Sequence, residues 1–171
     1  MSMDSNIRRL RPEDGEALVA LRREALESQP LAFGSAVGED RGLSLELVRA
    51  SLADPDEQAV FGCFEGDHLT GMVGVRRDSG VKRRHRAHVW GMYVAAVARG
   101  KGAGRALLEA TVGQARAWPG IGQVRLSVTD PAVAARKLYE TAGFQIWGRE
   151  PRALQWEGRF VDEIHLVLEL G

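Results

Sequence analysis

The sequence predicts an α/β protein with a mixed, mainly antiparallel sheet of about seven strands flanked by about four helices. Two apolar periods carry this prediction: a helical spacing of apolar residues in some stretches, and strict alternation with polar residues in others. Proline, glycine and short polar side chains mark the element boundaries. The chain shows no repeat, low-complexity tract or long linker, so residues 1–171 are expected to form one domain.

The amino-terminal third predicts one strand and two helices. Residues 7–12 form a short strand-like run, and Pro12 then opens a helix because proline and acidic residues favour the first turn. Apolar residues at helical spacing continue this helix as far as Ser28. Ser44 is expected to cap a second helix, which runs through Ala53.

The apolar period changes to two in the middle of the chain. Residues 59–64 and 69–76 flank a short polar turn and predict a hairpin, and residues 86–94 predict the next strand. A helix is expected from the glycine-rich turn after this strand to Trp118. Residues 124–128 alternate again, which predicts a further strand.

The last predicted elements are a helix and two strands. Asp130 is expected to cap the helix, with Pro131 at its first position and Gly143 at its end. Residues 144–147 and 160–170 predict the closing strands. The resulting order is β-α-α-β-β-β-α-β-α-β-β, and parallel pairing is expected where a helix crosses over between strands.

Charge and cysteine content argue against several classes of function. Lysine plus arginine and aspartate plus glutamate number 23 each, so no global field attracts nucleic acid or a membrane surface. Cys63 is the single cysteine, which excludes an intramolecular disulfide and a cysteine-based zinc site. The segment MSMDSNIRRL has no apolar signal core and no stretch approaches the length of a membrane span, so a cytoplasmic protein is expected.

The stretch VARGKGAGRALL, residues 97–108, predicts an anion site. Lys101 is followed by glycine, which excludes a Walker A loop, and Arg105 stands where the dinucleotide fingerprint needs glycine. The pattern that fits is Arg-x-x-Gly-x-Gly, from Arg99 to Gly104, between a strand and a helix. Amides at such a helix start lack intrahelical partners and donate to phosphate oxygens. The alternative is a tight turn that needs glycine for its geometry alone.

The neighbouring residues resemble the GCN5-related N-acetyltransferase (GNAT) family. The resemblance lies in HVWGMYVAAVARGKGAGRALL, which begins at His88, and in ARKLYETAGF, which ends at Phe144. The two motifs have the family's order and spacing and together span about a third of the chain. The segments REALESQPLAFGS and RFVDEIHLVLEL are weaker points of similarity to bacterial members. The resemblance implies a GNAT-like sheet that splays between its fourth and fifth strands.

The resemblance also implies acetyl-CoA as co-substrate. Its pyrophosphate would lie on the amides of residues 100–105, and its pantetheine arm would lie along residues 92–94 like an added strand. The family often has asparagine where this chain has Ala132, so that side-chain contact is missing here. The expected cofactor-binding residues are Met92, Tyr93, Val94, Arg99, Gly100, Lys101, Gly102, Ala103, Gly104, Arg105 and Ala135.

Acyl transfer to an amine needs a neutral amine, a donor for the developing oxyanion and a proton for the leaving thiolate. In the family, the tyrosine that matches Tyr139 lies near the thioester sulfur, which implies that Tyr139 is the acid. Its reference pKa of about 10 keeps the phenol protonated at neutral pH. Helical spacing alone would make it a buried aromatic. The expected oxyanion donor is the backbone amide of Met92 or Tyr93.

Several residues are candidates for the general base. His88 begins the cofactor strand, where related proteins often have an acidic residue, although a partly buried structural histidine fits the same position. Glu163 on the last strand is a comparable candidate, as are Glu39 and Asp40 after the first helix. The pattern leaves these alternatives open, and His88 and Glu163 join Tyr139 as the catalytic candidates.

Cys63 offers a possible covalent route. It lies in the apolar run Val-Phe-Gly-Cys-Phe without a histidine at useful spacing, which favours an inert buried thiol over an acyl-enzyme. No spacing of histidines and carboxylates suggests a metal site. The sequence therefore predicts direct transfer of an acetyl group from acetyl-CoA to a primary amine in a ternary complex.

Two other classes of function stay open. Residues 76–86, RRDSGVKRRHR, carry six basic side chains and could form a nucleic-acid-binding hairpin. Overall neutrality and the lack of interleaved aromatics favour a solvated loop, or one that guides an acidic acceptor. A CoA- or nucleotide-sensing module would keep the phosphate site without catalysis.

No motif specifies the acceptor. Residues 31–42, the basic loop and residues 148–161 have the least pattern and are expected to shape the acceptor pocket. The expected partner is a small-molecule, peptide or protein amine, without nucleic acid or membrane, and the family makes a homodimer an open expectation.

Overall fold

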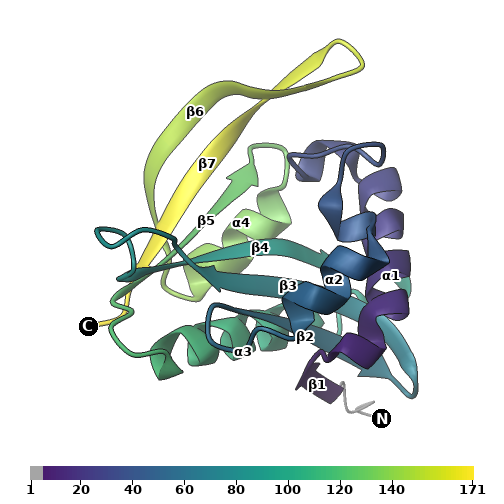
Figure 1. Ribbon diagram of the computed structural model, residues 1–171. Helices are drawn as coiled ribbons and strands as arrows, with labels where there is room; N and C mark the ends of the chain where they lie inside the picture. Colours follow the sequence, from purple (N-terminus) through teal and green to yellow (C-terminus); the bar gives the residue numbers. More distant parts are fainter. Residues whose placement is uncertain (1–5) are drawn as a thin grey trace.

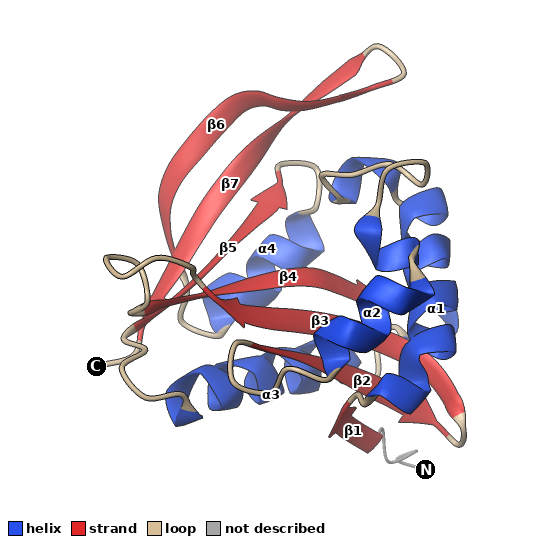
Figure 2. Cartoon of the chain, in the orientation of Figure 1, coloured by secondary structure: helices blue, strands red, loops and turns tan. Residues whose placement is uncertain are grey.

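The computed structural model describes residues 6–171. It has a seven-stranded mixed sheet with helices on both faces (Figures 1 and 2). The strand order is β1-β2-β3-β4-β5-β7-β6, in which β4 and β5 are parallel and all other neighbours are antiparallel. The strands are β1 (Asn6–Arg9), β2 (Gln58–Glu65), β3 (His68–Arg77), β4 (Arg86–Val94), β5 (Gln123–Thr129), β6 (Gln145–Trp156) and β7 (Arg159–Glu169). The helices are α1 (Gly15–Ser28), α2 (Leu45–Leu52), α3 (Ala103–Ala117) and α4 (Val133–Thr141).

The predicted fold class and element order are confirmed. The Ser44 side chain accepts a hydrogen bond from the Leu47 amide at 3.4 Å and caps α2 as expected. The helix predicted from Pro12 begins as a 3-10 turn and becomes α1 at Gly15. The expectation of no signal peptide rests partly on residues 1–5, which lie outside the described residues. Among residues 6–171, no helix is long and apolar enough to cross a membrane.

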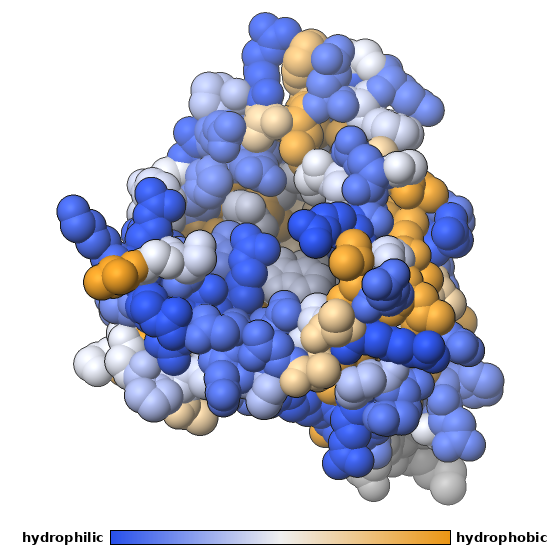
Figure 3. Space-filling model, viewed as in Figure 1, coloured by the Kyte–Doolittle hydropathy of each residue, from blue (hydrophilic) through white to orange (hydrophobic). Residues whose placement is uncertain are grey.

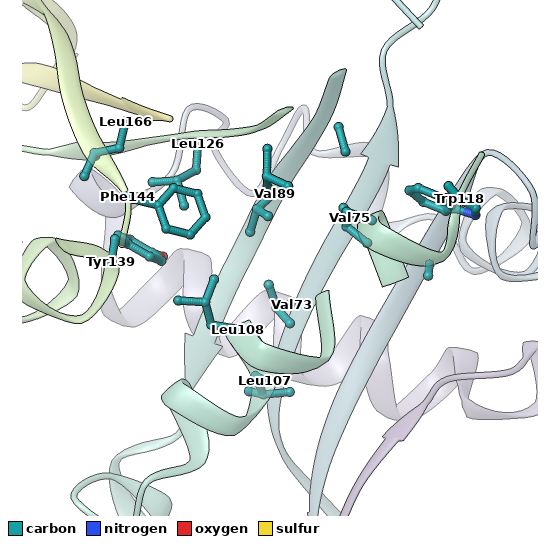
Figure 4. Packing of buried hydrophobic residues seen from close by; sticks show 14 of the residues in the cluster. Val73, Val75, Val89, Leu107, Leu108, Trp118, Leu126, Tyr139, Phe144 and Leu166 are labelled. Atoms are coloured by element: carbon teal, nitrogen blue, oxygen red, sulfur yellow. The ribbon is translucent and has the colours of Figure 1, made fainter. Parts of the chain in front are cut away.

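Two apolar cores hold the helices against the two faces of the sheet. α3 and α4 pack on one face through residues such as Leu107 and Tyr139, with Val73 and Leu126 from the strands (Figure 4). α1 and α2 cover the other face, where Leu21 and other helix residues meet the strands. The alternation of β3 and β4 side chains between these cores fixes which residues face each side.

The sheet splays open between β4 and β5, as the resemblance implied. Within the described residues, the β4–β5 pairing covers Arg86 to His88 opposite Gln123 to Arg125, and the strands then diverge. β5 instead stays paired with β7 along its whole length. Gly91 lies in the unpaired half of β4 with φ of +67°, next to an irregularity in the β3–β4 register. The second half of β4 is therefore an open strand edge.

The predicted cap of α4 is wrong. The helix begins at Val133 after Ala132, which makes no side-chain cap bond. Asp130 instead accepts a hydrogen bond from the Asp162 amide at 3.2 Å, and its other oxygen lies 3.4 Å from Arg149. The carboxylate therefore ties the end of β5 to β7, because a partner from the neighbouring strand outcompetes the local helix start.

The predicted end of a strand at Trp147 is also wrong. β6 continues to Trp156 and forms a long antiparallel ribbon with β7, which projects from the sheet (Figure 1). Most β6 side chains are exposed whichever way they point. A ribbon without a buried face lacks the alternation that reveals a strand, so the sequence pattern ended at Trp147.

Candidate active site

A groove of about 650 Å³ lies at the start of α3. Its walls come from the end of β4, the turn before α3 and the start of α4. All the predicted cofactor-binding residues except Lys101 line it, namely Met92, Tyr93, Val94, Arg99, Gly100, Gly102, Ala103, Gly104, Arg105 and Ala135. Ala132, the position that departs from the family pattern, lines it as well.

The turn at residues 100–105 presents a run of free amides. Gly100 and Gly102 have φ of +76° and +84°, a region that side chains other than glycine disfavour. The first bond of α3 is from the Ala106 amide to the Gly102 carbonyl at 3.1 Å. Within residues 6–171, the six amides from Gly100 to Arg105 make no intramolecular hydrogen bond. They are donors for an anion, at the positive end of a 15-residue helix.

The open edge of β4 leads away from this turn. The Ala95 amide bonds to the Thr70 carbonyl on β3 at 2.8 Å. Backbone groups alternate in direction along a strand. The N–H and C=O groups of Tyr93 therefore also point toward β3, and those of Met92 and Val94 point toward the open edge. The Val94 carbonyl accepts a hydrogen bond from Arg99 at 2.9 Å, which agrees with this direction. Of the two predicted oxyanion donors, the geometry therefore favours the Met92 amide.

The side chain of Tyr93 makes contacts that hold the fold together. Its hydroxyl donates to Glu24 at 2.9 Å and lies 3.2 Å from the Ser28 hydroxyl, both on α1. Arg99 lies over its ring, 5.7 Å from the centroid. Tyr93 therefore connects β4 to α1.

The basic side chains of the turn form surface ion pairs. Lys101 lies 2.8 Å from Glu65 on β2, and Arg105 lies 2.8 Å from Glu109 one helical turn later. Exposed pairs of this kind contribute about 1 kcal/mol or less, so they exchange readily for an anionic ligand. The fixed amides are therefore the main candidates for anion binding in this turn.

A smaller cavity of about 130 Å³ continues from the groove into the splay between β4 and β5. It shares Met92, Ala132 and Ala135 with the groove, and Tyr139 lines it. Figure 4 shows Tyr139 on α4 beside Phe144, whose ring centroid is 6.1 Å away. Burial raises the pKa of Tyr139 to about 12, so its hydroxyl stays protonated throughout the neutral range.

The comparisons with known proteins agree with this geometry. The sequence model of the acetyltransferase (GNAT) family matches residues 18–144. The chain belongs to the GNAT acetyltransferase family. Acetyl-CoA is the acetyl donor of this family. Comparison with curated protein sequences gives no match.

Solved GNAT structures share the fold over nearly the whole chain. A GNAT acetyltransferase from Streptococcus pneumoniae is 23% identical with a TM-score of 0.84, and the match covers 98% of this chain and 100% of that one. A ribosomal-protein-alanine N-acetyltransferase from Brucella melitensis is 25% identical with a TM-score of 0.82, over 96% and 99%. The putative acetyltransferase yncA from Salmonella typhimurium, solved with acetyl-CoA, is 22% identical with a TM-score of 0.85, over 98% and 95%.

The two candidate bases of this GNAT protein flank the Tyr139 cavity. His88 lies at the last β4–β5 pair, one residue before the lining residue Val89. Burial, reinforced by the guanidinium of Arg76, lowers the pKa of His88, so the imidazole is neutral at pH 7. Glu163 pairs across the sheet with Thr129, which lines the cavity. Neither candidate is among the described residues that line it.

The other two acidic candidates lie at a third cavity, of about 620 Å³, between α1, α2 and the β3–β4 face. Asp40 is bonded to Arg22, with Nη2 to Oδ2 at 2.7 Å and Nε to Oδ1 at 3.2 Å. Burial by itself raises the pKa of Asp40, but the hydrogen bonds from Arg22 and Ser35 hold that pKa below its usual value. A carboxylate engaged in this way is a poor base. Glu39 lines the same cavity and accepts from the Ala36 amide at 3.2 Å.

Sequence reasoning missed Arg22, Trp90 and Gln29. Gln29 lines both the groove and the Tyr139 cavity, and Trp90 lines the Tyr139 cavity and the third one. Arg22 was detectable, because it follows Leu18 by four residues on the buried face of α1. A charge in an apolar stripe indicates a buried partner or a site.

Several basic side chains at the loop between β3 and β4 are engaged in ion pairs or hydrogen bonds. Arg84 lies 2.7 Å from Glu57, and Arg86 lies 3.0 Å from Asp78. Arg77 donates to the carbonyls of Arg84 and Pro119 at 3.0 and 3.1 Å. This pairing fits a structured surface loop better than a nucleic-acid interface.

Proposed function

We propose that this GNAT protein transfers the acetyl group of acetyl-CoA directly to a primary amine. The observation that carries the proposal is the continuity of three features: the free amides of residues 100–105, the open edge at Met92 and Val94, and the cavity at Tyr139. A diphosphate suits a helix start, and an amide-bearing arm suits an open strand edge. The thioester would then lie where the two cavities meet.

Residues of this chain supply two of the three chemical requirements directly. The Met92 amide faces the open edge and donates to the oxyanion that develops on the thioester carbonyl. The amine nitrogen forms the new bond to that carbon as the carbon–sulfur bond breaks. The neutral hydroxyl of Tyr139 offers a hydrogen bond, and then a proton, to the departing sulfur. The nitrogen is cationic after its attack, and the proton that it then loses restores the phenol. The general base acts earlier, on the ammonium form of the free amine.

The third requirement is removal of a proton from the amine. Since neither His88 nor Glu163 is among the described residues that line the Tyr139 cavity, each would act through an intervening water. The lowered pKa of His88 leaves it free to accept a proton at pH 7. The proposal assigns this role to His88 with Glu163 as the alternative, and single His88→Gln and Glu163→Gln variants separate them by their pH–rate profiles.

Direct transfer is supported by the position of Cys63. Its side chain is fully buried in the core on the α3 face, and Thr70 donates to its carbonyl at 3.2 Å. A thiol in this environment does not reach the groove, so an acyl-cysteine intermediate has no support. A ternary complex requires intersecting initial-velocity lines when acetyl-CoA and amine are varied together.

Ligand-dependent thermal stability tests the donor site. We expect acetyl-CoA at 100 times its Kd to stabilise the protein by about 2.7 kcal/mol, with no comparable effect from ATP or NAD. The diphosphate is common to all three ligands, so the pantetheine contacts at the β4 edge make the difference. Equal stabilisation by ATP would refute the assignment of the groove to acetyl-CoA.

A further inference from the structure

We propose that the acceptor is a small amino acid-like amine whose carboxylate binds Arg22 and Trp90 in the third cavity. This inference rests on the proposed acetyl transfer and names the substrate class of the same site. The third cavity and the Tyr139 cavity share Trp90 and Gly91, and the Tyr139 cavity shares Met92 with the donor groove. Figure 3 shows this face of the molecule hollowed at its centre. The third cavity therefore adjoins the Tyr139 cavity, beside which the thioester would lie.

Two buried donors in this cavity lack partners. Arg22 Nη1 and Trp90 Nε1 are both inaccessible to solvent and make no hydrogen bond within the described part of the chain. Both residues line the third cavity. Buried polar groups are normally satisfied, so each of these two donors is expected to pair with an acceptor from outside the chain. A carboxylate has two oxygens and can accept from both donors.

Arg22 is held in place before any ligand arrives. Asp40 occupies Nε and Nη2, Ser35 donates a hydrogen bond to the same carboxylate, and Phe33 lies under the guanidinium at 4.8 Å. This arrangement leaves Nη1 as the free donor. A Cβ at Gly91 would lie 3.5 Å from that nitrogen, so the absence of a side chain keeps the approach from β4 open.

Trp90 is fixed by its neighbour on β3. Its indole lies across Gly74, where a Cβ would come within 2.1 Å of Trp90 Cε2. The two residues are paired in the β3–β4 register. The ring therefore fills the space that the missing side chain of Gly74 leaves open.

The charge around the cavity also favours an anion. The lining includes the three arginines Arg22, Arg41 and Arg76 against the two carboxylates of Glu39 and Asp40. Arg22 and Asp40 neutralise each other, and Arg76 has no ion-pair partner among the residues that the structure describes. The cavity volume, about 620 Å³, is in the range of small-molecule sites.

Trp90 lies close to the proposed reaction centre. It is separated from Met92 by Gly91 alone, whose φ of +67° takes β4 out of the extended conformation. A carboxylate held at Trp90 would therefore need its amine only a few bonds away. An α-amino acid has this geometry, and a peptide amino terminus has a neutral amide in place of the carboxylate.

Matched acceptor pairs test the proposal: each L-amino acid against its own carboxamide, with amino-terminal peptides as a third arm. We expect kcat/KM for the acids to exceed that for the carboxamides by about 10- to 100-fold, the range for hydrogen bonds to a charged group. Trp90→Phe removes the N–H and keeps a ring, and should reduce the preference about five- to tenfold. Arg22→Lys should raise the acceptor KM and leave the acetyl-CoA Kd unchanged.

Arg23→Lys is the matched control, because Arg23 is the exposed neighbour of Arg22 on α1. It should leave the acid preference intact. Equal rates with acids and carboxamides, or a preference for peptides, would overturn the inference while leaving acetyl transfer standing. Failure to bind acetyl-CoA, or to release thiol with any amine, would instead overturn the proposed function.

Discussion

Tyr139 combines burial with a place in the wall of the cavity between β4 and β5. The residue is 5% exposed and packs in the α3–α4 core, yet it lines the cavity between β4 and β5. Helical spacing and the family motif gave competing interpretations of this position, as core aromatic or as acid. The structure places Tyr139 in the core and in the wall of this cavity, and its role as the acid stays a prediction.

Tyr139→Phe separates the two roles. The variant keeps the ring and its contact with Phe144, so we expect little change in stability. Loss of the proton donor should lower kcat about 100-fold. Steady-state rates and calorimetric titration with acetyl-CoA measure the two effects, and an unchanged kcat would remove Tyr139 from the mechanism.

His88 should make stability depend on pH. Its folded-state pKa is lowered by burial and by Arg76, so the unfolded chain takes up this proton more readily. The stability that His88 contributes is therefore fully present above its unfolded pKa of about 6.5, and is lost as the pH falls through the lower folded pKa.

Denaturant titrations from pH 7.5 to 5 compare wild type with His88→Gln. The wild type should lose stability relative to the variant as the pH falls below about 6.5. Parallel curves would show that the imidazole ionises equally in both states.

The candidate site residues that could be predicted from the sequence are those with a local sequence signal. The glycine turn could be predicted, because it has a local sequence signal. Its positive φ angles require glycine at particular positions, and this spacing can be recognised without knowledge of distant contacts. Arg22 was missed although a charge on the buried face of α1 is a local signal, and only its contact with Asp40 shows its role. Trp90 was missed because its role depends on its packing across Gly74. Such contacts between distant segments leave little trace in residue spacing.

At the scale of elements, the start of α3 is the part most sensitive to a single methyl group. Gly102 has φ of +84° and open space where a Cβ would lie, and it borders the donor groove. Gly102→Ala should destabilise the protein by about 1–2 kcal/mol. It should also weaken acetyl-CoA binding at least tenfold, because the methyl group or a shifted turn disturbs the amides.

Gly113→Ala is the control for this substitution. Gly113 lies within α3 on an exposed position with open space around it, so alanine should stabilise the helix by about 0.5–1 kcal/mol. Chemical denaturation and acetyl-CoA titration of both variants measure the effects. Full affinity in Gly102→Ala would show that the amides of this turn do not hold the diphosphate.

The elements that sequence predicted less well are those whose form depends on distant partners. Asp130 has the local signature of a cap but bonds to Asp162 on β7. β6 lacks alternation because its ribbon is exposed on both sides. By contrast, β4 was predicted with its observed bounds, since its hydrophobic side chains meet packed helices on both faces.

At the scale of the whole molecule, the splay of the sheet organises the site. The divergence of β4 from β5 after His88 leaves an open strand edge and the cavity that Tyr139 lines. The α1–α2 side adds the third cavity, so donor and acceptor would approach from different directions. The assignment of residues 1–171 to one domain stays a prediction, and it requires a single cooperative unfolding transition.

Amine-dependent release of the coenzyme A thiol tests the central claim most directly. The wild-type protein, incubated with acetyl-CoA and a panel of primary amines, should release thiol at a rate that depends on the amine, with one acetylated amine formed per thiol. Thiol release that no amine accelerates, in protein shown to bind acetyl-CoA, would contradict the account and leave a sensor or a thioester hydrolase in its place.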